Sequence, residues 1–140
     1  MTENVHATDR HGHTPLMTAA REGSIEAVVD LLNRGAEIDA KSNKGKTALH
    51  YAASNGHAET IKLLLEHGAT VDARDRDGHT PLMSAANYGC NECILTLIEY
   101  GADINARTMT GNTAMVYAET NGHPDTLDLL KKAQRFKQAG

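Results

Sequence analysis

The stretch GHTPLMTAAREG, residues 12–23, recurs three more times along the chain, each time 33 positions further on. Its counterparts are GKTALHYAASNG at residues 45–56, GHTPLMSAANYG at 78–89 and GNTAMVYAETNG at 111–122. All four copies keep a glycine at both ends, a threonine in the third place and an alanine in the eighth. Self-similarity at a fixed period of this length is typical of repeat architectures, so the sequence predicts a stack of similar units.

The repeat divides the chain into four units, approximately residues 9–41, 42–74, 75–107 and 108–137, within a single domain of residues 1–140. Residues 1–8 read as the tail of a preceding unit. In each unit a polar turn precedes a threonine such as Thr14, which can cap a helix, and Pro15 suits the first helical position. Gly23 should end this helix. A second helix follows, with Leu31 on its inner face, and Gly35 should end it in a left-handed conformation.

These features resemble the ankyrin repeat, whose signature is T-P-L-H-x-A at a period of 33. The matching segments are TPLMTA at 14–19, TALHYA at 47–52, TPLMSA at 80–85 and TAMVYA at 113–118. A closing segment recurs as GAEIDA at 35–40, GATVDA at 68–73 and GADINA at 101–106. The resemblance covers residues 5–133. It implies an all-α solenoid of helix-turn-helix units joined by β-turn or hairpin loops.

The chain departs from the family pattern at the motif histidine. Only His50 keeps it, and Met17, Met83 and Val116 stand at the equivalent positions. The resemblance implies that this histidine hydrogen-bonds neighbouring turns, so we expect those turns to be tied less tightly where it is replaced. Units one and three share GHTPLM, whereas units two and four share a tyrosine, at positions 51 and 117.

Composition narrows the function classes. The chain has 140 residues, is 40% hydrophobic and carries a formal net charge of −4, which argues against a general nucleic-acid binder with a basic face. Its longest aliphatic run, Leu63–Leu65, is too short to span a membrane. The N-terminal residues contain no apolar signal-peptide region. We therefore expect a cytoplasmic monomer without a membrane or nucleic-acid partner.

The sequence also lacks the marks of an enzyme. No nucleophilic triad and no phosphate-binding glycine loop are recognisable, so we expect no catalysis and no cofactor. The recurring carboxylates belong to the first turn of each second helix, where the helix dipole favours them: Glu26, Glu59, Glu92 and Asp125.

Cys90 and Cys93 form a C-x-x-C, a spacing that can indicate a redox dithiol or half of a zinc site. Both nevertheless fall on ordinary repeat positions. Ser24, His57 and His123 are equivalent to the first cysteine, and Ala27, Thr60 and Thr126 to the second. We interpret them as scaffold residues. The alternative is a metal-binding or thiol-redox protein that uses this pair and loop histidines such as His6, His11 and His13.

The resemblance implies a non-catalytic module that binds another protein on a concave face, made of the turn tips and the exposed sides of the first helices. Tyrosine and arginine, common at interface hot spots, occur in this set, and Tyr51, Tyr88 and Tyr117 are the expected anchors. A purely structural or engineered scaffold is the remaining alternative. The predicted partner-binding residues are Arg10, His11, His13, Thr18, Arg21, Asn43, Lys44, Lys46, Tyr51, Ser54, Asn55, Arg76, Asp77, His79, Ser84, Asn87, Tyr88, Met109, Thr110, Asn112, Tyr117 and Thr120.

Overall fold

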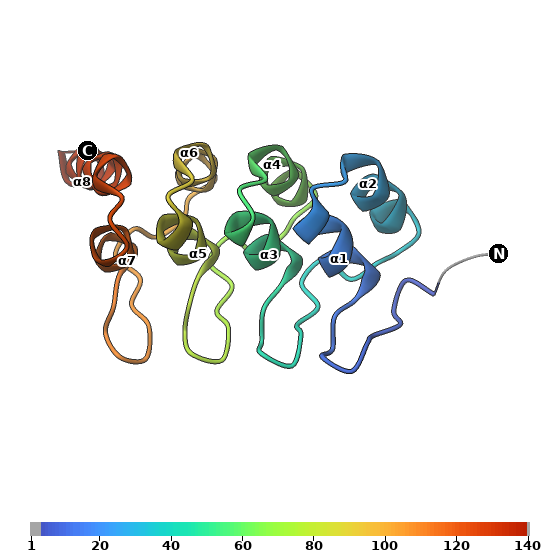
Figure 1. Ribbon diagram of the computed structural model, residues 1–140. Coiled ribbons are helices and arrows are strands. Elements are labelled where there is room, and N and C mark those ends of the chain that lie inside the picture. Colours follow the sequence, from blue (N-terminus) through green and yellow to red (C-terminus); the bar gives the residue numbers. More distant parts are fainter. Residues whose placement is uncertain (1–3, 140) are drawn as a thin grey trace.

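A computed structural model describes residues 4–139 and shows four helix pairs in a row (Figure 1). No β-strand occurs within these residues, so the predicted all-α repeat fold is confirmed. The helices are α1 (Pro15–Glu22), α2 (Ile25–Asn33), α3 (Ala48–Ser54), α4 (Ala58–Glu66), α5 (Pro81–Tyr88), α6 (Asn91–Glu99), α7 (Ala114–Thr120) and α8 (Pro124–Ala139).

The first helix of a unit begins and ends where the sequence predicts. The Thr14 hydroxyl accepts a hydrogen bond from the Met17 N–H at 3.2 Å, which satisfies one of the free amides at the start of α1. Gly23 ends the same helix with φ 72°, and its N–H donates to the carbonyls of Ala19 and Ala20. Glycine tolerates this left-handed conformation because it has no Cβ.

The second helices differ in length for a reason that can be read in the sequence. Gly35, Gly68 and Gly101 follow α2, α4 and α6 with φ values of 90°, 93° and 92°. Unit four has Gln134 at the equivalent place. With no glycine to end it, α8 continues to Ala139 and contains 16 residues, whereas α2, α4 and α6 contain 9 each.

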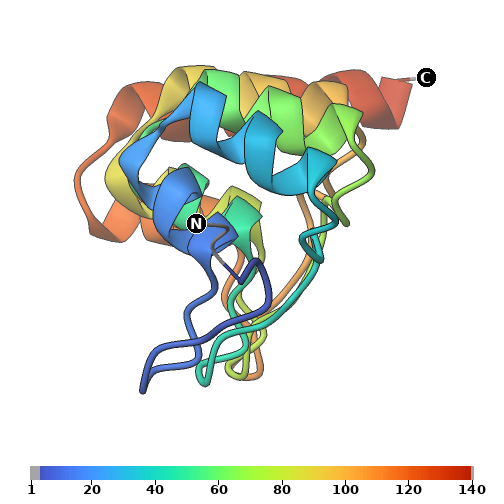
Figure 2. The same ribbon diagram turned by 90° about the vertical axis from the view of Figure 1, so that its right-hand side faces the viewer.

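The helices form two layers. The first helices α1, α3, α5 and α7 pack side by side, and the second helices α2, α4, α6 and α8 lie over them (Figures 1 and 2). Alanines at equivalent places, such as Ala20, Ala53 and Ala86, are completely buried and allow the first helices to approach closely. Larger side chains, including Leu64 and Ile94, fill the space between the layers. No helix within residues 4–139 has both the length and the apolar character needed to cross a bilayer.

Between units the chain forms narrow loops, which we call fingers: residues 9–13, 42–46, 75–79 and 108–112. Figure 2 shows them projecting away from the helix layers. Each finger is closed by a hydrogen bond between its end residues, for example from the Ser42 N–H to the Lys46 carbonyl at 2.9 Å. The first residue of each finger has a side chain that accepts hydrogen bonds from backbone N–H groups of the same finger. Asp9 Oδ1 accepts from the N–H groups of His11 and His13 at 2.8 and 2.9 Å.

Candidate functional site

The four finger tips are joined into one continuous ridge. The Asn43 N–H donates to the His11 carbonyl at 2.9 Å, and the Arg76 N–H donates to the Lys44 carbonyl at 3.0 Å. The Met109 N–H likewise donates to the Asp77 carbonyl of the third finger at 3.0 Å. The Arg76 Nη1 donates to the Asn43 carbonyl at 3.1 Å as well. Asn43 and Arg76, predicted as partner-binding residues, therefore also hold neighbouring fingers together.

A chain of hydrogen bonds joins the first finger to α3. Asp9 Oδ2 lies 3.1 Å from His13 Nδ1, His13 Nε2 lies 3.1 Å from the Tyr51 hydroxyl, and that hydroxyl donates to Ser42 Oγ at 3.1 Å. The N–H of His13 is the main reason why the pKa of Asp9 falls to about 2. The Tyr51 hydroxyl is thus already bonded within the protein, which limits its use as the anchor that the sequence predicts.

The same arrangement recurs two units later. Asp75 Oδ2 lies 3.3 Å from His79 Nδ1, and His79 Nε2 lies 2.8 Å from the Tyr117 hydroxyl. Burial alone would raise the pKa of Asp75, but the His79 N–H and the Lys46 Nζ at 3.0 Å outweigh it, so the pKa is lowered. These contacts explain why histidine alternates with tyrosine in the sequence. A histidine in an odd unit bonds to a tyrosine in the next even unit.

Tyr88 differs from the other two predicted anchors. It is the last residue of α5, and 62% of its surface is exposed. Met109, at the tip of the fourth finger, is 81% exposed. Ser84, also predicted as a partner-binding residue, is only 8% exposed.

The structure distributes the other predicted residues between exposed and half-buried positions. The exposed ones are Arg10, His11, Arg21, Asn43, Lys44, Asn55, Arg76, Asp77, Thr110 and Thr120. The half-buried ones are His13, Thr18, Lys46, Tyr51, Ser54, His79, Asn87, Asn112 and Tyr117.

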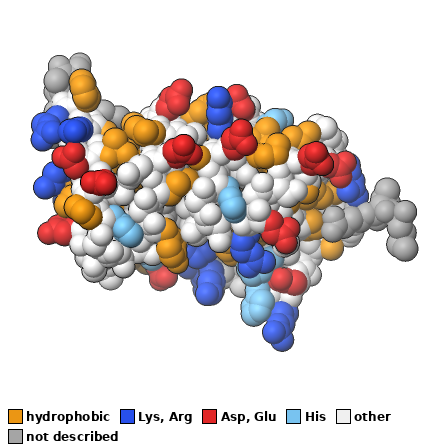
Figure 3. Space-filling view, turned by 45° about the horizontal axis from the view of Figure 1, so that its top comes forward, with side chains coloured by type: hydrophobic (Ala, Val, Ile, Leu, Met, Phe, Trp, Pro, Cys, Tyr) orange, Lys and Arg blue, Asp and Glu red, His pale blue; other side chains and the backbone are white. Residues whose placement is uncertain are grey.

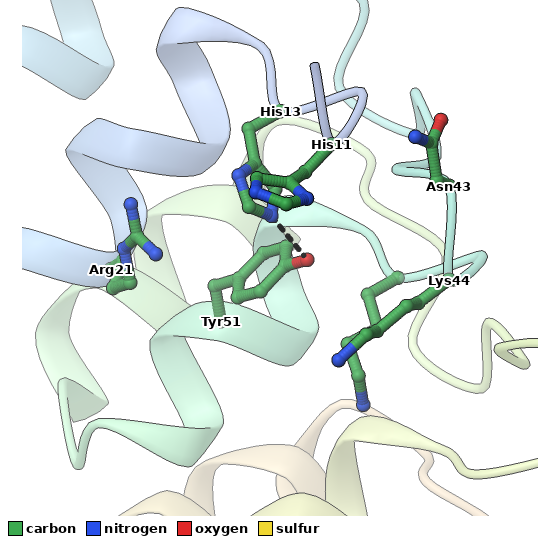
Figure 4. Close-up of a pocket in the computed structure, with 7 residues that line it drawn as sticks. His11, His13, Arg21, Asn43, Lys44 and Tyr51 are labelled. Atoms are coloured by element: carbon green, nitrogen blue, oxygen red, sulfur yellow. Dashed lines mark hydrogen bonds between the residues drawn. The ribbon is translucent and has the colours of Figure 1, made fainter. Parts of the chain in front are cut away.

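A hollow of about 460 Å³ opens between the first two fingers and the ends of their helices (Figure 4). We call it the basic hollow; its lining contains no carboxylate and consists of His11, His13, Arg21, Asn43, Lys44, Lys46 and Tyr51. Among the described residues, neither the Lys44 ammonium nor the Arg21 guanidinium has a hydrogen-bond or ion-pair partner. Unpaired cations in a concave site favour an anionic group.

Charge elsewhere on the molecule is more evenly mixed. Figure 3 shows Lys, Arg and His side chains gathered along the lower edge, towards the N-terminal units, while acidic, basic and hydrophobic side chains are interspersed over the helices above. The chain as a whole has more acidic than basic residues, 18 against 14. The basic hollow is therefore a local concentration of positive charge on an acidic protein.

A second hollow of about 170 Å³ lies one unit further on. Its lining includes Ser84, Asn87, Tyr88 and Tyr117, and it shares Lys46 with the basic hollow. Many of the predicted residues on the first three units, together with Tyr117 of the fourth, thus line two adjoining depressions.

One group within residues 4–139 has its ligand atoms close enough for a metal ion: Asp75, Asp77 and His79. The oxygens of Asp75 already have partners, because Oδ1 accepts from the N–H groups of Asp77 and His79 and Oδ2 accepts from Lys46. A cation would have to displace that lysine. The ring nitrogens of His13, considered above for a histidine metal site, are likewise bonded to Asp9 and Tyr51.

The two cysteines, which the sequence analysis interprets as scaffold residues, are joined to each other. A disulfide links Cys90 to Cys93, a bond that the sequence analysis does not predict. Cys90 is the residue before α6, and Cys93 lies in its first turn, so their Cα atoms are only 5.3 Å apart, a separation that a disulfide can bridge. The repeat position of Cys93 was interpreted correctly, because its side chain is completely buried.

A family profile described as ankyrin repeats, with three copies, matches residues 16–108 and also residues 74–139. The chain belongs to the ankyrin repeat family. No curated protein sequence matches it. Ankyrin repeats are generally protein–protein interaction modules and are typically non-catalytic.

Two features of this ankyrin repeat protein escaped the sequence analysis. The first is the series at the base of each finger, Asp9, Ser42, Asp75 and Thr108, whose side chains accept from backbone N–H groups. The sequence did contain a signal for this series, because Asp, Ser and Thr recur there every 33 residues and their side chains commonly hydrogen-bond to the backbone of the turn that they begin. The second is the basic hollow, which has no signal in any single repeat because its lining comes from two units.

Proposed function

We propose that this ankyrin repeat protein is a non-catalytic interaction module that binds another protein along the fingers and the first helices. The basic hollow supports this proposal most directly, because a partner could place a carboxylate or another anionic group between Lys44 and Arg21. Tyr88, exposed beside the second hollow, would supply an apolar contact with a hydroxyl at its edge. The partner class is a protein with an exposed acidic segment.

The geometry also assigns different roles to the three tyrosines. Tyr51 and Tyr117 hold the binding surface together through His13 and His79. Tyr88 is free to make a contact with the partner. Replacing Tyr51 by alanine would disturb the scaffold as well as the surface, so it is a poor test of binding.

The test compares capture of partners from a native lysate by the wild type and by two variants, Arg21→Glu/Lys44→Glu and Tyr88→Ala. Both variants change exposed side chains, so the fold should be retained. Matched controls lie on the second helices: Lys62→Glu, also an exposed charge reversal, and Leu95→Ala, which truncates a side chain that is 53% exposed.

We expect a protein captured by the wild type and by both controls to be lost with Arg21→Glu/Lys44→Glu and reduced with Tyr88→Ala. For the purified pair, each lost contact should weaken binding by about 1–3 kcal/mol, or roughly 5- to 150-fold. The proposal is wrong if the controls abolish binding while the two variants retain it.

A further inference from the structure

The cysteine pair at the start of α6 differs from the equivalent positions of the other units. In units two and four a histidine occupies the place of Cys90, and its ring lies over the glycine that ends the preceding unit's first helix. His57 Nε2 bonds to the Arg21 carbonyl at 2.9 Å, and a Cβ placed on Gly23 would meet that ring at 2.6 Å. His123 and Gly89 repeat this arrangement.

The third unit leaves this place open. The glycine to compare is Gly56, which follows the first helix of unit two as Gly23 follows that of unit one. A Cβ on Gly56 would meet nothing within 4 Å. Cysteine is smaller than histidine and does not cover the glycine. Cys90 is itself half-buried at this point, so part of the residue is in contact with solvent.

The surroundings of Cys90 also favour its thiolate. Cys90 stands at the N-cap of α6, and the Cys93 N–H donates to its Sγ at 3.2 Å. A donated hydrogen bond and the positive end of a helix of 9 residues both stabilise a negative sulfur. Cys93, in contrast, is completely buried, and the sulfur that it can reach directly is that of Cys90.

We propose that Cys90 and Cys93 form a reversible thiol–disulfide site that exchanges with low-molecular-weight disulfides, with Cys90 as the attacking residue and Cys93 as the resolving residue. This proposal does not depend on the protein-binding function. Cys90 loses its proton to solvent, and its thiolate attacks one sulfur of the small disulfide. The sulfur–sulfur bond of that molecule breaks, one thiolate leaves, and a mixed disulfide remains on Cys90.

The thiol of Cys93 then loses its proton to the departed thiolate and attacks Cys90 Sγ. The mixed disulfide breaks, the second small thiolate leaves and takes up a proton from solvent, and the Cys90–Cys93 bond forms. In total, two electrons pass from the protein dithiol to the small disulfide, which becomes two thiols. An excess of small dithiol reverses the reaction.

The repeat itself supplies conservative variants for the test. Cys90→Ser introduces the residue found at position 24, where Ser24 caps α2 by accepting from the Ala27 N–H. Cys93→Ala introduces the residue found at position 27, and Cys93→Thr, after Thr60 and Thr126, is the substitute if the alanine variant does not fold. The reduced proteins are treated with oxidised glutathione, and the products are followed by mass spectrometry and thiol titration.

We expect the wild type to lose both thiols without retaining glutathione, and dithiothreitol to restore both. Cys93→Ala should accumulate one glutathione on Cys90, and Cys90→Ser should react at least about tenfold more slowly because its remaining thiol is buried. In urea this difference between the variants should disappear. Equal rates for the two folded variants, or a wild type that keeps both thiols in excess oxidised glutathione, would overturn the proposal.

Discussion

His50 shows how one side chain can connect two units. Its Nδ1 accepts from the Thr47 N–H at 3.0 Å, so the neutral ring carries its proton on Nε2, which lies 2.8 Å from the His79 carbonyl. Met17 and Met83 replace the first of these interactions, because their sulfurs accept from the N–H groups of Thr14 and Thr80 at 3.4 Å. A thioether has no proton to donate, so it cannot replace the bond to the next finger.

The burial of His50 predicts that stability depends on pH. Burial lowers the pKa of His50 from 6.5 to about 4, since the charged ring would lose its hydration. The unfolded chain therefore binds a proton at a higher pH than the folded chain. Stability from this residue is fully present above pH 6.5 and falls by about 3 kcal/mol as the pH drops towards 4.

His50→Met tests this prediction with the residue that the chain uses at positions 17 and 83. At pH 7 the variant should be less stable by about 1 kcal/mol, because it loses the bond to His79. Between pH 6.5 and 4 it should lose less stability than the wild type and become the more stable protein. Urea unfolding at several pH values measures both effects, and parallel pH profiles would refute the role given to His50.

At the scale of the elements, the turn between two helices is held by a glycine and by the unit that follows. Gly23 and Gly56 have nearly the same φ, 72° and 74°. A side chain at Gly23 would collide with the His57 ring, whereas the space at Gly56 is open. The two positions therefore separate the conformational need for glycine from the need for space.

Gly56→Ala should lower the free energy of unfolding by about 1 kcal/mol, the cost of a left-handed alanine. Gly23→Ala should cost this amount plus the displacement of His57 from the Arg21 carbonyl, about 1 kcal/mol more. Thermal and urea unfolding of the two variants provide the comparison. Equal losses of stability would show that the histidine contact over Gly23 contributes nothing.

At the scale of the whole molecule, the stack consists of two similar pairs of units joined by a different interface. Units one and two are tied by the His13–Tyr51 contact, and units three and four by the His79–Tyr117 contact. The middle interface instead contains the ion pair between Lys46 and Asp75, with the Asp75 side chain only 3% exposed. The shared GHTPLM of units one and three therefore corresponds to a two-unit pattern of contacts.

We predict that Asp75→Ala weakens the middle interface. This substitution should lower the free energy of unfolding by about 2 kcal/mol at neutral pH, because two finger N–H groups and Lys46 lose their acceptor. Asp9→Ala is the matched control: Asp9 has the same place in the first finger, but its side chain is 52% exposed. Asp9→Ala should lower the free energy of unfolding by clearly less than Asp75→Ala does.

A double-mutant cycle with Lys46→Met separates the ion pair from the rest of this effect. The cost of Asp75→Ala should fall when Lys46 is already absent, while the cost of Asp9→Ala should not change. Because the pKa of Asp75 is lowered from 3.8, its contribution is present above pH 3.8 and is lost as the pH falls below that value. If the two alanine variants cost the same at neutral pH, the middle interface does not depend on this carboxylate.

Sequence alone was sufficient for the repeat and its helices. A period of 33 residues, threonines before the first helices and glycines after them are local signals, and local hydrogen bonds satisfy them, as at Thr14 and Gly23. The tail of α8 also follows from a local feature, the missing glycine at position 134. The unit boundaries, the single domain and the partner itself remain predictions.

Tertiary structure decided which of the chosen surface residues are available. Tyr51, Tyr88 and Tyr117 are all predicted anchors, yet two of them are bonded to histidines 38 positions away and, of the three, Tyr88 alone is exposed. The basic hollow and the open space over Gly56 likewise depend on which side chains neighbouring units bring together. A repeat pattern specifies each unit, whereas packing between units determines which polar groups are already paired and which remain free to bind.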